Sequence, residues 1–151
     1  MRPVTALVGA LGALLVCAAI ALAATPSKGL HEGMTSQNRG VDVKVGTNHH
    51  IRRFRIDWRA GKCDSPHGAW SDGTTVKNPR HQPGDGSFSD SGKYKGDPIS
   101  GGYVGHFKYS LSGTFTSASD AHGTFSARVR VTKNGTTVDH CHTGKLTWKV
   151  S

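Results

Sequence analysis

Acidic residues are scarce in this 151-residue chain, which has ten Asp and Glu against 19 Lys and Arg and only one glutamate, Glu32. The paired-carboxylate chemistry of glycosidases would therefore need two aspartates. A G-x-S-x-G nucleophile elbow is also missing, since Gly84-Asp85-Gly86-Ser87 lacks that pattern. Serine and histidine residues are so numerous that a Ser-His-Asp triad could be assembled from them by chance, so that possibility does not indicate a hydrolase. These features favour a protein that is not an enzyme.

A closely spaced set of four metal ligands, such as paired C-x-x-C motifs, is absent, which disfavours a structural zinc site. Motifs for nucleic-acid binding are missing too, and the aromatic residues alternate toward the expected interior, so no stacking platform is left for bases. We therefore predict no cofactor and no specific nucleic-acid partner.

The one long apolar run lies at the N-terminus. Arg2 precedes a nearly unbroken stretch from Val4 to Leu22, and Ala21-Leu22-Ala23 has the small residues of a cleavage site. A transmembrane anchor is the alternative, because the run approaches bilayer length; a lipoprotein signal at Cys17 fits less well. The pattern predicts a signal peptide over residues 1–23, a secreted product and no membrane anchor after cleavage.

Three cysteines are present, and the predicted cleavage removes Cys17. An even pair, Cys63 and Cys141, remains in a small exported domain, which is most simply one disulfide bond. The two positions are 78 apart in the sequence, so the chain-entropy model gives a stabilisation of about 4 to 5 kcal/mol.

Period-2 alternation dominates the rest of the chain, and no segment after the signal shows helical periodicity. Residues 24–39 are polar and aperiodic, which predicts a flexible leader before a single, monomeric β domain over residues 40–151. Strands are expected at Val41–Val45 and Ile51–Arg59. The stretch 64–100 is hardest to interpret: Asp72-Gly73 and Asp85-Gly86 predict turns, with short strands at 74–77 and 86–89.

The C-terminal third alternates most clearly. Strands are expected at His106–Phe115 and Gly123–Thr132, followed by a type I′ turn at Asn134-Gly135, a return to Cys141 and a last strand after Gly144. The resulting fold class is all-β: an antiparallel β-sandwich or flattened barrel of about eight strands.

Three C-terminal segments carry a family resemblance: Gly113-Thr114-Phe115, residues 121–125 (AHGTF) and residues 139–148 (DHCHTGKLTW). They are similar to a group of small exported hypothetical proteins of actinobacteria, whose chains end in G-x-F, A-x-G-x-F and C-x-(T/S)-G-x-(L/V)-x-W. The resemblance implies a β-rich exported domain with paired cysteines, and it implies no activity and no functional residue.

Positive charge provides the first candidate site. Cationic side chains occupy the outward positions of three expected strands, and we predict that they bind an anion if these strands share a sheet: Arg53, Arg55 and Arg59; Arg128 and Arg130; Lys145 and Lys149. The partners expected outside a cell are anionic glycopolymers or the cell-envelope surface. The alternative is a charged, soluble sheet face that discourages edge pairing.

Histidine provides the second candidate. His140 and His142 share one face of an extended strand while Cys141 points the other way. Such a pair can supply two ligands of a Zn²⁺ or Cu²⁺ site, with a third from His49, His50 or Asp139 if the strands adjoin. Two solvated surface histidines are the simpler interpretation.

Overall fold

The computed structural model describes residues 24–66, 68–81 and 86–151, and the predicted signal peptide lies outside them. Within this part of the chain every regular element is a β-strand, and every pairing is antiparallel, which confirms the all-β prediction. The strands are β1 (Gly29–Thr35), β2 (Gly40–Val45), β3 (Ile51–Ala60), β4 (Lys62–Cys63), β5 (Trp70–Lys77), β6 (Arg80–His81), β7 (Ser87–Lys95), β8 (Tyr103–Phe115), β9 (Ala121–Lys133), β10 (Thr136–His142) and β11 (Leu146–Val150).

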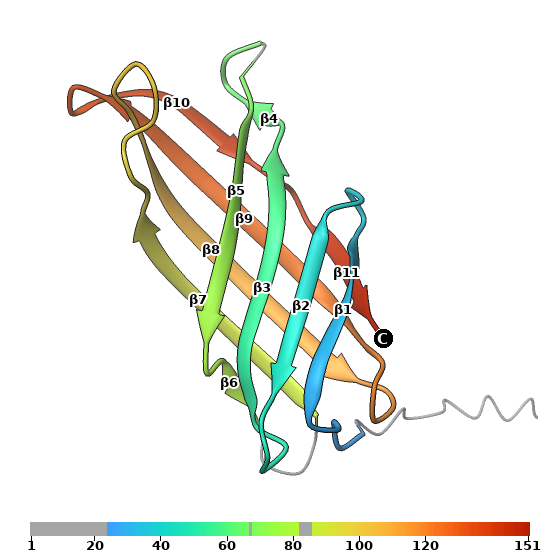
Figure 1. The fold of residues 1–151 in the computed structure, drawn as a ribbon. Coiled ribbons are helices and arrows are strands. Elements are labelled where there is room, and N and C mark those ends of the chain that lie inside the picture. The colour runs from blue at the N-terminus through green and yellow to red at the C-terminus, as the bar shows by residue number, and fades with distance from the viewer. Residues whose placement is uncertain (1–23, 67, 82–85) are drawn as a thin grey trace, which may run out of the picture.

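Eight strands form one continuous path, in the order β5-β3-β2-β1-β11-β9-β8-β7, with β6 beyond β7. The path curls, so that β5, β3 and β2 cross in front of β7, β8 and β9 (Figure 1). The expected sandwich or flattened barrel is corrected to an open half-barrel. The strands belong to one sheet, and no backbone pairing joins β5 to β7 among the described residues.

The core lies inside the curl, between its two halves. Trp58 of β3 packs against Phe107 of β8 and Phe125 of β9, with ring centroids 5.9 and 6.3 Å apart, and Phe54 packs against Trp148 at 5.2 Å. Such contacts combine large apolar burial with favourable ring geometry. These rings fill the interior of the curl between β3 and the strands β8, β9 and β11.

Side chains, not backbone, connect the two edges of the half-barrel. The Tyr94 hydroxyl of β7 lies 2.9 Å from the Thr74 hydroxyl of β5, and the Trp58 indole N–H donates to the same Thr74 oxygen at 2.8 Å. Burial and the nearby Asp72 carboxylate raise the pKa of Tyr94 to about 12, so the phenol is neutral at physiological pH.

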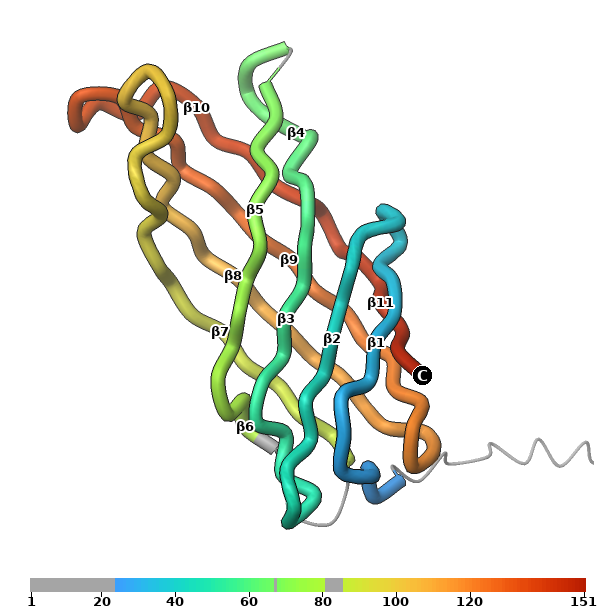
Figure 2. The backbone as a smooth tube through the Cα atoms, in the orientation of Figure 1, coloured from blue at the N-terminus to red at the C-terminus, as the bar shows by residue number. Residues whose placement is uncertain are grey.

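At the other end, a disulfide bond between Cys63 and Cys141 connects β4 to β10, as predicted. β10 and β11 lie one after the other along the same edge of β9, and Figure 2 shows this long return of the chain. The Thr143 hydroxyl between them accepts a hydrogen bond from the Ala127 N–H at 2.9 Å. The disulfide therefore joins β4, the short strand that follows β3, to β10, which pairs with β9.

Two local predictions are corrected by the strand boundaries. The predicted flexible leader contains β1, which pairs with β2 and β11; its inward positions carry His31, Gly33 and Thr35, so it lacks hydrophobic alternation. Asp72-Gly73 lies inside β5 and is no turn, because Gly73 pairs with Asp57 of β3. The turn at Asn134-Gly135 is confirmed, with φ values of 50° and 80°.

Candidate anion-binding face

The outward side chains of β7, β8, β9 and β10 are aligned by strand register into two rows. Side chains that alternate with them, including Phe107, Val129 and Cys141, are buried in the core, so the rows point away from it. We call these eight residues the basic face. The first row is Lys95, His106, Arg130 and His140, and the second is Lys93, Lys108, Arg128 and His142.

The basic face lines a surface groove of about 800 Å³. Neighbouring strands in a sheet lie about 4.8 Å apart, and same-face residues along one strand are about 7 Å apart, so this arrangement brings five Lys and Arg side chains into one small area. Like charges at such spacing repel one another and create a concentrated positive potential. The groove is therefore suited to a ligand with several negative charges.

Acidic groups hardly interrupt this face. Asp64 is the one acid among the described residues that line the groove. Its carboxylate lies 3.1 Å from His140 Nδ1, and both side chains are well exposed, at 75% and 61%. An exposed pair of this kind is weak and screened by salt, so most of the positive charge on the basic face is not neutralised.

His106 responds to the charge around it. It lies between Lys95 and Arg130 in the first row, and its Nε2 is 3.2 Å from the Thr132 hydroxyl. Partial desolvation, then the neighbouring Arg130 and Lys95 cations, lower the pKa of His106 below its usual value. An anion bound beside His106 would offset this repulsion and favour its protonated form.

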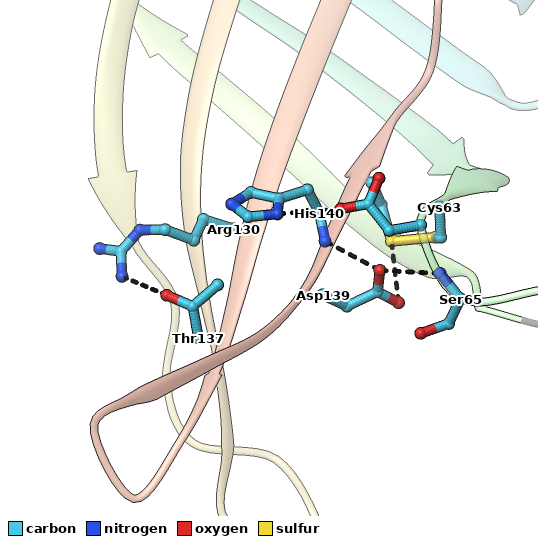
Figure 3. A network of polar contacts seen from close by, with 8 residues as sticks. Cys63, Ser65, Arg130, Thr137, Asp139 and His140 are labelled. Carbon is cyan, nitrogen blue, oxygen red and sulfur yellow. Dashed lines mark hydrogen bonds and ion pairs between the residues drawn. A yellow bond between two sulfur atoms is a disulfide. The ribbon is translucent and has the colours of Figure 1, made fainter.

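A network beside the disulfide holds β10 in place (Figure 3). Burial favours the protonated form of Asp139, but the carboxylate accepts hydrogen bonds from the Ser65 N–H at 3.2 Å and the His140 N–H at 2.8 Å. These bonds outweigh burial and lower the pKa of Asp139. Nearby, Arg130 donates to the Thr137 hydroxyl at 3.3 Å. The position of His140 is thus fixed by both the disulfide and this ionised carboxylate.

Sequence reasoning grouped Arg53, Arg55 and Arg59 with Arg128 and Arg130, and the structure does not bring them together. β3 and β9 are separated in the sheet order by β2, β1 and β11, and they lie on opposite halves of the curl (Figure 1). Two of the three predicted β3 arginines form ion pairs with acids. Arg53 pairs with Asp42 at 2.9 Å and Arg55 with Asp57 at 3.6 Å.

The two lysines predicted for the same surface lie apart from it as well. Lys149 points outward from β11 and pairs in register with His122, and Lys145 lies between β10 and β11. Neither lines the basic groove.

The histidines predicted as metal ligands are divided between the two ends of the molecule. His140 and His142 lie on one face of β10, as expected. His49 lies in the β2–β3 turn, with its Nδ1 2.7 Å from the Pro26 carbonyl oxygen, and the whole length of β3 separates it from β4 and β10. A site made of these three histidines therefore does not form.

Among the described residues, the group of three close metal-ligand side chains is Cys63, Asp139 and Cys141. Its two sulfur atoms are bonded to each other, so they are not thiolates that could coordinate an ion.

Four members of the basic face escaped sequence reasoning: Lys93, Lys95, His106 and Lys108. The lysines of β7 lie in the stretch that was hardest to interpret, where Gly92 and Asp90 break the hydrophobic alternation. The sequence did contain a signal for these four residues, namely Lys-x-Lys at 93–95 followed by His-x-Lys at 106–108. A β-hairpin with its turn between the two motifs places their side chains next to one another on one face.

No family model, no curated protein and no solved structure matches the chain. The basic face is therefore interpreted from its geometry alone. The similarity to exported actinobacterial proteins stays a prediction. In the described part of the chain, no helix is long and apolar enough to cross a membrane.

Proposed function

We propose that the protein is an exported, non-enzymatic binding module whose basic face docks on anionic polymers outside the cell or in the cell envelope. The observation that carries the proposal is the pair of aligned rows on β7–β10, with five Lys and Arg side chains, three histidines and a single acid. An array of this kind attracts polyanions from a distance and holds them by many weak, salt-sensitive contacts.

Export is supported by two independent features. The N-terminal apolar run ends in Ala21-Leu22-Ala23, as signal peptides do. The Cys63–Cys141 disulfide fits an oxidising compartment. Outside the cell, the polyanions available to a basic module are acidic polysaccharides and phosphate-containing envelope polymers.

The test is retention on immobilised heparin, a sulfated polysaccharide, with elution by a salt gradient. The key variant removes three charges of the basic face: Lys108→Gln, Arg128→Gln and Arg130→Gln. At about 1 kcal/mol for each cation near an anionic surface, we expect heparin affinity to fall on the order of 100-fold. The control variant, Arg53→Gln, Arg55→Gln and Arg59→Gln, removes the same charge from β3.

We expect the control to lose no more than about threefold, because two of these three arginines, Arg53 and Arg55, are paired with acids. Native-like circular dichroism of both variants shows that they are folded. Equal losses in the two triple variants, or no salt-sensitive retention of the unmodified protein, would overturn the proposed function.

A further inference from the structure

The outward surface of β7, β8 and β9 continues past the basic face and changes character. Beyond Lys93, Lys108 and Arg128, the next two rows carry only hydroxyl side chains. We call these six residues the hydroxyl face: Ser91, Ser110 and Ser126 in one row, and Ser89, Ser112 and Thr124 in the next. A second groove, of about 590 Å³, lies over the outer of these rows and includes the side chains of Arg80 and His122.

This composition is not what strand formation requires. β-Branched and aromatic residues favour strands, whereas five of the six positions carry serine. The hydroxyls also lie at defined positions, since Ser112 Oγ and Thr124 Oγ1 are 3.0 Å apart across the β8–β9 pair. A hydroxyl group both donates and accepts hydrogen bonds. An ordered array of them matches a ligand that is itself rich in hydroxyl groups.

The two faces are continuous along the strands. From His106 in the first basic row to Ser112 in the outer hydroxyl row is six residues of β8, or about 20 Å. A polymer lying along β8 and β9 would meet a dense array of cations at one end and, at the other, rows of hydroxyls with the single arginine Arg80 beside them. Inorganic polyphosphate carries a charge on every unit, so it gains less from an end where hydroxyls outnumber the one cation. An acidic polysaccharide with interspersed uncharged sugars uses both.

We infer that the hydroxyl face is a saccharide subsite, and that the ligand class of this module is an acidic polysaccharide lying along β8 and β9. The inference rests on the proposed function, because the basic face binds the acidic groups of the same polysaccharide molecule. The hydroxyl face recognises the sugar, and the basic face supplies the attraction.

The experiment compares two polymers on one pair of variants. Hyaluronan oligosaccharides have acidic rings that alternate with uncharged rings, and inorganic polyphosphate of similar length has no sugar. The test variant is Ser112→Ala with Thr124→Val, which removes two hydroxyls that contact each other and leaves neither without its partner. The control is Ser71→Ala with Thr75→Val, the same changes at exposed outward positions of β5.

We expect the test variant to bind hyaluronan about tenfold more weakly, as two lost neutral hydrogen bonds predict, and polyphosphate within about twofold of the unmodified protein. The control variant should bind both polymers normally. Unchanged hyaluronan binding by the test variant, an equal loss for both polymers, or polyphosphate binding without any hyaluronan binding would each overturn the saccharide subsite. If the unmodified protein binds neither polymer, the proposed function itself fails.

Discussion

The two outer faces of the curled sheet use cations in opposite ways. On β2 and β3, which we call the mixed face, two acids accompany five cations: Asp42 and Asp57 with Lys44, Arg52, Arg53, Arg55 and Arg59. On the basic face, one acid accompanies five Lys and Arg and three histidines. The ion pairs with Asp42 and Asp57 partly offset the field of the mixed face, whereas among the described residues no ion pair joins an acid to a lysine or arginine of the basic face. The arrangement of charges, more than their number, distinguishes a binding surface from a soluble one.

The largest expected effect concerns the covalent link between the two faces. The disulfide joins β4, which follows the mixed-face strand β3, to β10 of the basic face. Replacing both cysteines, Cys63→Ala with Cys141→Ala, should lower the free energy of unfolding by roughly 4 kcal/mol. Guanidinium denaturation measures this.

Heparin affinity should change little under native conditions in the same variant, because the lysines and arginines of the basic face belong to β7, β8 and β9. A loss of stability below about 1 kcal/mol, or a loss of binding in a folded protein, would show that the disulfide has a different role.

The next effect, on the order of tenfold in heparin affinity, is a pH dependence that we expect from the basic face and not from the mixed face. Imidazole is the side chain whose charge changes near neutral pH, and the basic face contains His106, His140 and His142. We expect heparin affinity at constant ionic strength to rise by about tenfold from pH 7.5 to 5.5, because each positive charge gained beside the polyanion contributes about 1 kcal/mol. Substituting His106→Gln, His140→Gln and His142→Gln should remove the rise.

In the unliganded protein, the contribution of His106 to folding stability should change in the opposite direction and decrease as the pH falls. Its folded-state pKa is lowered, so the unfolded chain binds more protons near the usual histidine pKa. Stability from this group is therefore complete above the unfolded pKa and is lost as pH falls toward the folded one. Titration of the His106 imidazole by NMR, with and without heparin, should show its pKa rising on binding. An unchanged pKa in the bound state contradicts the coupling.

The smallest effect comes from placing a second acid next to the basic face, at the adjoining position Ser126 of the hydroxyl face. Ser126→Asp places a carboxylate two residues before Arg128 on the same outward face, much as Asp57 follows Arg55 on β3. We expect heparin affinity to fall about fivefold, about 1 kcal/mol. The matched change Asp57→Ser on the mixed face should alter affinity by less than twofold, and a larger effect there than at Ser126 would invalidate the contrast between the faces.

Much of the fold could be predicted from local pattern. The alternation in β2, β3, β8 and β9, the Asn134-Gly135 turn and the cysteine pair depend on residues near one another or on simple counting. β1 could not be predicted, because its inward His31, Gly33 and Thr35 are polar or small. The strands expected at 74–77 and 86–89 overlap β5 and β7 but are too short, because the glycine and aspartate within these strands interrupt the hydrophobic alternation.

The site depended on information that local pattern does not contain. Whether Arg55 or Lys108 lies beside Arg128 is decided by strand order and register, which are set by contacts between distant segments. Sequence reasoning identified Arg128, Arg130, His140 and His142 correctly as outward residues and then gave them the wrong neighbours. The same limit applies to His49, whose distance from β10 follows from the length of β3.

The most direct test of the account is NMR mapping of the backbone and side-chain signals of the disulfide-bonded protein during titration with a heparin hexasaccharide. The account predicts salt-sensitive shifts that concentrate on β7, β8 and β9, around Lys93, Lys108 and Arg128, with the mixed-face residues Arg53 and Arg55 nearly unchanged. Shifts of equal size on both faces, or shifts centred on β3, would contradict it.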